Sequence, residues 1–300
     1  PTRVLDVSGE GPDIILYETE SESAHYACLS HCWGASQIIQ TTEESLESFK
    51  ERIIISELSR TFQDAVQIVR QLGIKYLWID SLCIIQDSPK DWERESARMA
   101  SVYANSLVTI AATKSASGDG GCFSFNPDTI IQGLTKDKLP YMTYARQKIL
   151  HWYQPHTPLL GRGWVYQERL LSPRIVHFGN QELPRECMEE TTCQCSGIND
   201  YAAGTLDRYE DVTISLAKIW HRMVREYSFL KLTRPSDKLT ALSGLAAQMQ
   251  SNRQAKYIAG LWEDTLLSDL LWFQLYALNP PHISRHPSWS WASVNGRIHF

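Results

Sequence analysis

Residues 76–87 have the sequence Tyr-Leu-Trp-Ile-Asp-Ser-Leu-Cys-Ile-Ile-Gln-Asp, and the rest of the chain is organised around them. A continuous apolar run rich in β-branched and aromatic residues is typical of a strand buried on both faces of a parallel sheet. Asp80 interrupts the run and places a carboxylate where the strand should end. The stretch therefore predicts a central buried strand with an acidic side chain at its carboxyl end.

A helix is predicted to follow this strand, from about Pro89 to Tyr103. Ser88 suits the N-cap position, Pro89 the first helical position, and Asp91 the third, where an acid favours the helix start. Apolar side chains at helical spacing form one stripe, made of Trp92, Met99 and Val102. Glu95 falls on the same stripe, so its carboxylate is expected to face inward.

Two interpretations of Glu95 follow from its place on the apolar stripe. In the first, its carboxylate pairs with an arginine and holds the fold together, because a buried charge needs a partner. In the second, it serves a functional site, because it lies on the inner face of a helix close to the end of a buried strand. Spacing alone leaves both interpretations open.

Further strand and helix patterns surround the central strand. Residues 26–30 and 107–112 are expected to form short buried strands, and Ser59 caps a helix that ends at Gly73. Weak alternation of apolar residues over 1–25 predicts an edge hairpin or an arm, and residues 174–178 are expected to form a further strand. The alternation of strands and helices predicts right-handed crossovers, and hence a three-layer α/β sandwich with a mainly parallel central sheet. Beyond this core, helices are expected at about 209–232, 237–249 and 257–278, and a strand-like segment at 287–294.

The composition excludes several classes of protein. Lys and Arg number 29 and Asp and Glu 34, which gives a net charge of −5 and no basic footprint for nucleic acid. No apolar run is long enough for a membrane span, and no signal peptide opens the chain. Neither a GxGxxG nor a GxxxxGK[ST] motif occurs, which argues against a standard dinucleotide oxidoreductase or P-loop enzyme. Seven cysteines, several of them in apolar runs, indicate reduced thiols and a cytoplasmic location.

The later cysteines raise the alternative of a metal site. Cys187, Cys193 and Cys195 lie close together in the sequence, with His177 upstream. Their spacing, C-x5-C-x-C, is not a standard zinc pattern, so no metal is expected. Another alternative is a cysteine hydrolase, in which His31 would act with Cys32 or with Cys83. The adjacent His31 and Cys32 would point to opposite faces of a strand, which makes them a poor pair.

Polar and aromatic residues gather at two places that could form a site. The strand at 26–30 ends in His31-Cys32-Trp33-Gly34, and ligands of parallel sheets bind at the carboxyl ends of strands. Residues 161–169, Gly-Arg-Gly-Trp-Val-Tyr-Gln-Glu-Arg, are equally dense in polar and aromatic groups. They form either a structural clamp of paired Arg and Glu, or they present Arg162 and Trp164 to an anionic ligand that contains a ring.

In order along the chain, these blocks resemble the fungal heterokaryon-incompatibility (HET) domain. The matching blocks are Tyr26-Ala-Cys-Leu-Ser-His-Cys-Trp-Gly34, Leu58-Ser-Arg-Thr-Phe-Gln-Asp-Ala65, residues 76–87, Asp91-Trp92-x-x-Glu95-x-x-x-Met99-x-x-Val102-Tyr103, and Gly163-Trp-Val-Tyr-Gln-Glu-Arg-Leu-Leu-Ser-Pro-Arg174. The resemblance covers about residues 24–178. It implies a HET domain at 1–180 and a mostly helical extension with a few strands, packed on that core, at 181–300. His31 departs from the family pattern, in which a tyrosine is more usual.

HET domains are implicated in cell death after non-self recognition and remotely resemble TIR domains. The resemblance therefore implies a TIR- or flavodoxin-like sheet, in which the strand at 26–30 corresponds to the first TIR strand. Glu95 corresponds to the helical glutamate of TIR domains that cleave NAD. The implied activity is hydrolysis of the nicotinamide–ribose bond of NAD(P)+, with the dinucleotide as substrate and no cofactor or metal. Glu95 would stabilise the oxocarbenium-like transition state.

The resemblance also implies a set of substrate-binding residues and partners. The binding residues are expected to be Ser30, His31, Trp33, Gly34, Asp80, Ser81, Trp92, Arg162, Trp164 and Glu168. Among them, Trp33 or Trp92 would stack on a ring, Asp80 would accept from a hydroxyl, and Arg162 would meet the diphosphate. A second copy of the chain and an upstream sensor protein are the expected protein partners. The alternative is a non-catalytic death-signalling module that self-associates or docks a partner.

Overall fold

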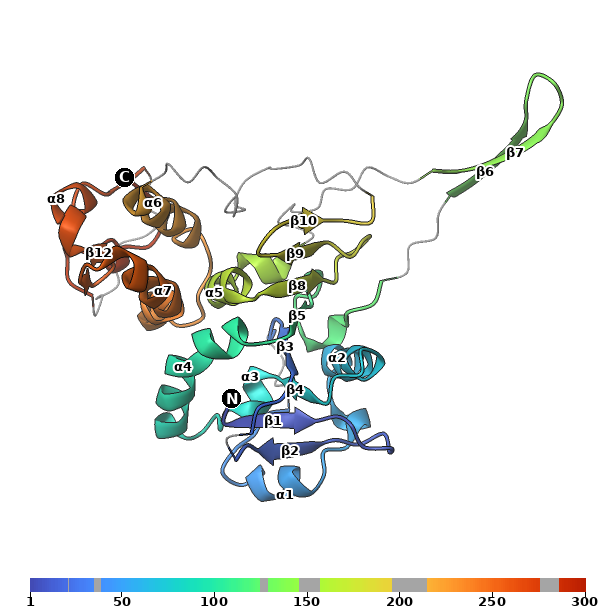
Figure 1. The fold of residues 1–300 in the computed structure, drawn as a ribbon, viewed down its shortest axis with the longest axis horizontal. Helices are drawn as coiled ribbons and strands as arrows, with labels where there is room; N and C mark the ends of the chain where they lie inside the picture. Colours follow the sequence, from blue (N-terminus) through green and yellow to red (C-terminus); the bar gives the residue numbers. More distant parts are fainter. Residues whose placement is uncertain (21, 35–38, 125–128, 146–156, 196–214, 276–285) are drawn as a thin grey trace.

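The computed structural model describes residues 1–20, 22–34, 39–124, 129–145, 157–195, 215–275 and 286–300, and within them eight strands form one sheet (Figure 1). Their order is β10-β9-β8-β5-β3-β4-β1-β2. The bounds are Arg3–Asp6 for β1, Ile15–Glu18 for β2, Tyr26–Ser30 for β3, Tyr76–Trp78 for β4, Val108–Ala111 for β5, Arg174–His177 for β8, Arg185–Cys187 for β9 and Thr191–Thr192 for β10.

The sheet is mixed, whereas the sequence predicted a mainly parallel one. The inner strands are parallel, since β3 pairs with β4 and β5, and β5 pairs with β8. Antiparallel hairpins extend both sides: β1 and β2 beyond β4, and β9 and β10 beyond β8. The hairpin of β1 and β2 agrees with the edge hairpin or arm predicted at 1–25. β9 and β10 are short and lack the continuous apolar run of a strand buried on both faces, so the pattern that revealed the inner strands did not reveal them.

The two crossovers of the inner sheet place helices on opposite faces. α2 (Arg60–Gln71) connects β3 to β4, and α4 (Pro89–Ala104) connects β4 back past β3 to β5. Because parallel crossovers are right-handed, opposite directions of travel put the two helices on opposite faces. Figure 1 shows α2 and α4 on either side of the strands, and α5 (Gly163–Leu171) beside α4. The three-layer α/β arrangement is confirmed; a kinship with TIR or flavodoxin folds stays a prediction.

Local sequence explains where the two helices begin. The Ser59 hydroxyl accepts a hydrogen bond from the amide of Phe62 at the start of α2, as an N-cap does. Pro89 opens α4 as expected, but the Ser88 side chain makes no capping bond. The Asp91 carboxylate instead accepts from the amide of Ile85, at 2.8 Å, and so joins α4 to the segment before it.

The apolar run that begins at Tyr76 is a strand only as far as Trp78. It continues as a single helical turn, α3 (Asp80–Cys83), whose Leu82 and Cys83 side chains are fully buried. The predicted inward stripe of α4 is confirmed, because Glu95, Met99 and Val102 are buried. A long apolar run can therefore supply a short strand and a buried turn, and burial alone does not distinguish the two.

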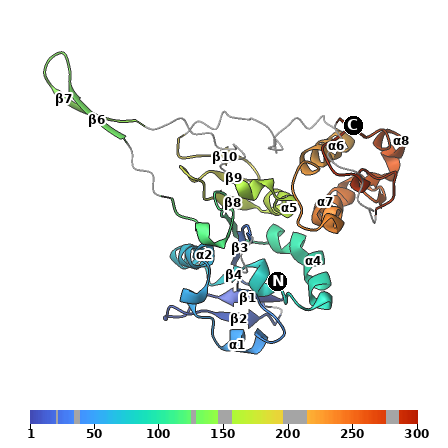
Figure 2. The same cartoon turned by 180° about the vertical axis from the view of Figure 1, so that it is seen from behind.

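The C-terminal region packs on the sheet domain through α7 (Ser243–Arg253), which lies beside α4 and α5 (Figure 2). The amide of Gly244 donates to Oε1 of Gln167 on α5, at 2.7 Å. Four large aromatic side chains fill the interior of this region: Trp220, Tyr227, Trp262 and Trp291. None of the described helices has the length and apolar character that crossing a membrane requires.

Several C-terminal elements differ from the expected ones. The helix expected at 209–232 is α6 (Leu216–Tyr227), and residues 209–214 lie outside the described part of the chain. At 237–249, two short 3-10 turns precede α7. The helices expected at 257–278 were wrong for the described residues up to 275, which form the hairpin β11 (Tyr257–Ile258) and β12 (Leu261–Trp262), a short helix α8 (Leu266–Asp269) and β13 (Phe273–Gln274). The strand-like segment at 287–294 holds a 3-10 turn, Trp291–Ser293, because the Ser290 hydroxyl caps it and Trp291 is buried.

Candidate functional site

The carboxyl ends of β3 and β4 carry a group of polar side chains that come from three parts of the chain. We call it the strand-end cluster, and it consists of Ser30, His31, Trp33, Asp80, Ser81, Arg162 and Glu168. Hydrogen bonds connect its members: Ser30 Oγ donates to Glu168 Oε2 at 2.6 Å, Trp33 Nε1 to Asp80 Oδ2 at 2.9 Å, and Arg162 Nη1 to the His31 carbonyl at 2.7 Å. The structure thus brings together seven of the ten predicted binding residues.

The fold positions this cluster at the point where the connections of the inner sheet change direction. β3 is flanked by β4 and β5, and the chain leaves β3 toward one side and later crosses to the other. Ligands of open α/β sheets bind outside the carboxyl ends of strands at such a switch point. Gly163 sets the start of α5 close to the chain at Leu232, since a Cβ at this position would lie 2.7 Å from Leu232 Cδ2. Arg162 and Glu168 are held over the strand ends by this packing.

The carboxyl group of Glu168 is a weaker acid than that of an ordinary glutamate. Its side chain is buried, and burial raises its pKa to about 7, with the nearby Asp80 acting in the same direction. The Ser30 hydroxyl, the Arg162 guanidinium and the Tyr103 hydroxyl lower the pKa but do not cancel the effect of burial. Glu168 can therefore bind or release a proton near neutral pH.

Asp80 is the centre of a second set of contacts. Oδ1 accepts from the amide of Ser81 at 2.7 Å, and Oδ2 accepts from the indole of Trp33. Nδ1 of His31 lies 3.7 Å from Oδ1. Burial lowers the pKa of His31, although Asp80 acts in the opposite direction, so the ring is neutral at physiological pH. A ligand hydroxyl that donates to Asp80, as predicted, would share this carboxylate with the Trp33 indole and the Ser81 amide.

Two buried polar atoms of the cluster have no hydrogen-bond partner among the described residues. They are Nε2 of His31 and Oγ of Ser81. Both residues are buried, and the His31 ring packs edge-on against Phe62, with centroids 4.9 Å apart. Buried polar groups are nearly always paired, so two unpaired atoms in one cluster are a feature of ligand-binding sites.

Glu95 lies outside the strand-end cluster's hydrogen bonds. Its Oε1 accepts from the Thr2 hydroxyl at 2.7 Å and from Nε of Arg94 at 2.9 Å, and the residue is 2% exposed. The Arg94 side chain itself is half exposed. These contacts match the first interpretation of Glu95, an acid that pairs with an arginine.

Glu95 nevertheless lies at the same edge of the sheet as Asp80. β1 runs antiparallel to β4 with Leu5 opposite Leu77, so Thr2 extends past the carboxyl end of β4. Burial raises the pKa of the Cys83 thiol to about 12, and the carboxylates of Asp80 and Glu95 both raise it as well. Both carboxylates therefore act on the Cys83 thiol from this edge of the sheet.

Asp91, one turn before Glu95 on α4, forms a more buried ion pair with an arginine than Glu95 does. Asp91 forms a buried ion pair with Arg3 of β1, and Nε of Arg3 also donates to the Cys83 carbonyl at 2.9 Å. Burial raises the pKa of Asp91, but hydrogen bonds from Arg3 and the Ile85 amide outweigh it and hold this pKa below its usual range. The sequence analysis missed this pair because Arg3 and Asp91 are 88 positions apart, and the edge hairpin or arm predicted at 1–25 does not indicate which strand lies beside it.

The three remaining predicted binding residues lie apart from the cluster's hydrogen bonds. Trp92 is half-buried and packs against the core, and the indole of Trp164 donates to Asp237 at 3.4 Å, toward the C-terminal region. Gly34 has a φ of +77°, and a Cβ there would lie 2.6 Å from the Cβ of Ser117, so only glycine fits this turn. Gly34 therefore shapes the loop after β3 whether or not it meets a ligand.

The sequence analysis also overlooked Tyr103. Its hydroxyl donates to the carbonyl of Leu29 at 3.2 Å and lowers the pKa of Glu168. Tyr103 lies four residues after Met99 on α4, so the helical period that selected Glu95 and Met99 also points to it. The cysteine-hydrolase alternative finds no support, because burial raises the pKa of Cys32 and of Cys83 and favours the unreactive thiol form.

The fold and the strand-end cluster define an α/β domain with a polar site at the switch point of its sheet. Residues 26–168 match the family model described as Heterokaryon incompatibility protein (HET), so this part of the chain is a HET domain, as the sequence predicted. All members of the strand-end cluster lie within the matched residues. Comparison of the chain with curated proteins and with solved structures found no match. A HET domain suggests a role in cell death during fungal heterokaryon incompatibility.

Proposed function

We propose that this chain is a cytoplasmic cell-death effector of fungal non-self recognition, and that it hydrolyses the nicotinamide–ribose bond of NAD(P)+. The observation that carries the proposal is the strand-end cluster. It combines the carboxyl groups of Asp80 and Glu168 with the guanidinium of Arg162, and it contains the unpaired buried atoms of His31 and Ser81. Such a set of groups suits a polar ligand with phosphates and ribose hydroxyls.

The reaction consumes one water and releases nicotinamide and ADP-ribose, or its 2′-phosphate. As the bond breaks, positive charge develops on the ribose, and a carboxylate beside it lowers the barrier. Glu95 is assigned this role, in keeping with its place on α4 at the edge of the sheet. Arg162 would bind the diphosphate and Trp33 would stack on a ring. Glu168, with a pKa of about 7, would take the proton of the attacking water.

Nicotinamide release by the purified chain tests the proposal. The assay is run with NAD+ and with NADP+ over a range of protein concentrations, because TIR-like enzymes often act only when assembled. Glu95→Gln should abolish release and leave the free energy of unfolding within about 1–2 kcal/mol of the parent. Glu93→Gln is the matched control, since Glu93 is an exposed acid on the same helix. If Glu95→Gln unfolds the protein, the structural interpretation of Glu95 prevails.

Two further variants identify the carboxyl group that acts. Glu168→Gln and Asp80→Asn each remove one acid of the strand-end cluster. Full activity in Glu95→Gln with loss of activity in either of these would move the catalytic role into the cluster. If the parent chain releases no nicotinamide at any protein concentration, including those at which it assembles, the hydrolase activity is excluded.

A specific observation also favours the non-catalytic alternative. The hairpin of β6 (Thr129–Leu134) and β7 (Pro140–Ala145), which we call the exposed hairpin, stands apart from the rest of the molecule (Figures 1 and 2). Cross-strand pairing puts four apolar side chains on one of its faces, all at least half exposed: Ile130, Leu134, Met142 and Tyr144. A monomer gains nothing from such a face, whereas a self-associating module would bury it against a second copy.

Self-association is tested by sedimentation at several concentrations. Met142→Lys places a charge on the apolar face and should weaken assembly. Thr143→Lys places the same charge on the opposite face, so it is the matched control. Equal assembly of both variants and the parent would exclude the hairpin as the contact. We also propose that residues 181–300 act as an extension on the HET core, which the packing of α7 on α4 and α5 supports.

A further inference from the structure

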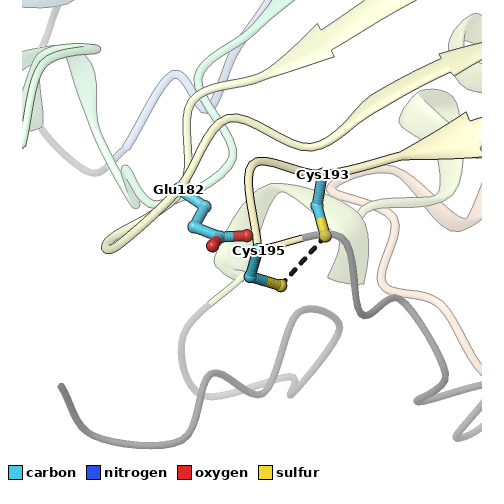
Figure 3. Close-up of side chains that lie close together, drawn as sticks. All are labelled: Glu182, Cys193 and Cys195. Atoms are coloured by element: carbon cyan, nitrogen blue, oxygen red, sulfur yellow. Dashed lines mark hydrogen bonds between the residues drawn. The ribbon is translucent and has the colours of Figure 1, made fainter. Parts of the chain in front are cut away.

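The edge of the sheet farthest from β1 carries a group of donor atoms outside the strand-end cluster. Glu182 lies in the turn between β8 and β9, and Cys193 and Cys195 follow β10 directly. Because β9 is antiparallel to both of its neighbours, β8 and β10, the chain leaves β10 at the same end of the sheet as it leaves β8 to enter the turn. Figure 3 shows the three side chains converging there from two separate segments.

We propose that Glu182, Cys193 and Cys195 form a binding site for a divalent metal ion of the zinc class. One donor atom from each, the two sulfurs and a carboxylate oxygen, lie within 4.8 Å of one another. The two sulfurs are 3.0 Å apart and share a hydrogen bond. Donors around one tetrahedral zinc ion lie about 3.3–3.8 Å from each other, given bonds of about 2.0–2.3 Å. Small side-chain movements would therefore bring all three to one ion.

The donor set selects the kind of ion. Thiolates are soft ligands that bind Zn2+ and related ions, whereas Mg2+ and Ca2+ prefer oxygen alone. Three protein donors are one fewer than a closed structural zinc site has, so a solvent molecule or another donor would complete the coordination. On binding, each thiol loses its proton to solvent, and the ion bonds to the two resulting thiolates and to the carboxylate.

Burial and access also suit an ion at this place. Glu182 is buried, which holds its carboxylate in position, while Cys193 and Cys195 are only half-buried. An ion can therefore reach the sulfurs from solvent. The sequence had suggested a different set, with His177 and Cys187. In the structure, His177 binds the Thr113 hydroxyl at 2.8 Å and lies 3.4 Å from Glu186.

Metal binding would connect two segments at the β10 edge of the sheet. β9 and β10 are joined to the sheet through short ladders only, and an ion held by Glu182 and the C-x-C pair would tie the turn before β9 to the chain after β10. The expected consequence is a rise in thermal stability when the ion is bound, since an ion that binds only the folded state stabilises it. This inference does not depend on the proposed hydrolase activity.

The test uses the full chain, purified under reducing conditions and stripped of metal with a chelator. Titration with Co2+ should produce thiolate-to-metal charge-transfer absorption that saturates at one ion per chain, and Zn2+ should displace it. Cys193→Ser and Cys195→Ser should each lose stoichiometric binding, and Glu182→Gln should weaken it. Cys187→Ser, a thiol of the same hairpin outside the cluster, is the matched control and should bind as the parent does.

The spectrum of the parent chain keeps the proposal falsifiable even if a variant fails to fold. Absence of charge-transfer absorption in the folded, reduced parent would overturn the proposal. The proposal would also be overturned if the Cys193→Ser and Cys195→Ser variants bound the ion as the parent does while their circular dichroism showed that they are folded. A Cys193–Cys195 disulfide that persists under the same reducing conditions, detected by mass spectrometry, would replace the metal site with a redox pair and would also overturn it.

Discussion

Ser30, the last residue of β3, donates a hydrogen bond of 2.6 Å to the carboxyl group of Glu168 on α5. The two residues are 138 positions apart in the chain, and both are buried. The bond therefore joins the first inner strand to a helix that lies between β5 and β8 in the chain. It also places a titratable group where the proposed substrate would bind, so the acidity of Glu168 links folding to function.

The raised pKa of Glu168 predicts that stability depends on pH. Between the ordinary glutamate value and about 7, the folded state holds a proton that the unfolded state releases. The free energy of unfolding is therefore highest below about pH 4.5 for this group and falls as pH rises toward 7, by up to about 3 kcal/mol. Glu168→Gln should remove this contribution and make denaturant unfolding less dependent on pH between 5 and 7.

Ser30→Ala is the companion variant for this prediction. The hydroxyl of Ser30 lowers the pKa of Glu168, so its removal should raise that pKa further and move the loss of stability to higher pH. A parent chain whose stability is flat from pH 5 to 7, relative to Glu168→Gln, would contradict the assigned acidity. Titration of the Glu168 carboxyl by isotope-edited infrared spectroscopy gives an independent measurement.

A second prediction concerns the contact between α7 and the HET core. Replacing a helical glycine by alanine usually stabilises a protein by about 0.5–1 kcal/mol. At Gly244, however, an added Cβ would overlap the Cβ of Ala100 on α4 and lie 2.8 Å from Oε1 of Gln167. Overpacking of this kind costs about 1–3 kcal/mol, so Gly244→Ala should destabilise the chain.

The controls for Gly244→Ala separate crowding from backbone effects. Gly11→Ala adds a Cβ with nothing within 4 Å and should change the free energy of unfolding by a few tenths of a kcal/mol at most. Adding Ala100→Gly to Gly244→Ala should restore part of the lost stability, because it removes the overlapping methyl group. A stabilised Gly244→Ala variant would mean that α7 does not pack closely on α4.

A third prediction concerns the ion pair of Arg169 on α5 with Glu186 on β9. Nε of Arg169 donates to Oε2 of Glu186 at 2.9 Å, and both side chains are largely buried. Burial raises the pKa of Glu186, but the Arg169 guanidinium and His177 outweigh it and hold this pKa well below its usual range. The stabilisation is therefore complete above about pH 4.5 and is lost as pH falls below that value.

Glu186→Gln leaves the buried guanidinium without its counter-charge and should cost about 3–5 kcal/mol in denaturant unfolding at pH 7. The double variant Arg169→Met with Glu186→Leu removes both charges and should recover most of that loss, because buried pairs replaced by apolar groups are often neutral. A double variant as unstable as the single one would show that the two residues act separately.

The inner sheet could be predicted from the sequence because burial on both faces leaves a strong pattern. The strand at 26–30 and the helix at 89–103 were located to within a residue or two, as was Glu95 on the buried side of that helix. The hairpin of β1 and β2 lies within residues 1–25, where weak alternation predicted an edge hairpin or an arm. The hairpin of β9 and β10 could not be predicted. β9 and β10 are three and two residues long, and their pairing depends on the sheet that precedes them.

The site could be predicted in its members but not in its internal contacts. The sequence identified the strand ends at Ser30 and Asp80 and the stretch around Arg162 as parts of a site. In the structure, hydrogen bonds connect these segments. Their partners depend on long-range packing, which a single sequence does not contain. The same limit explains why the sequence did not reveal that Glu182 lies close to Cys193 and Cys195, since no local spacing connects it to them.

A fourth prediction compares two acids on one face of α4 and addresses the role of Glu95. Asp91 is paired with the buried Arg3, whereas the Arg94 side chain that binds Glu95 is half exposed. Removing one partner of a buried pair costs about 3–5 kcal/mol, but a half-exposed pair contributes about 1 kcal/mol or less. Asp91→Asn should therefore destabilise the chain severely in denaturant unfolding, while Glu95→Gln should cost about 1–2 kcal/mol, including its bond to Thr2.

A double-mutant cycle of Thr2→Ala with Glu95→Gln should give a coupling free energy of about 1 kcal/mol. If Glu95→Gln proves as damaging as Asp91→Asn, the acid is required for folding, and any loss of nicotinamide release in that variant says nothing about catalysis.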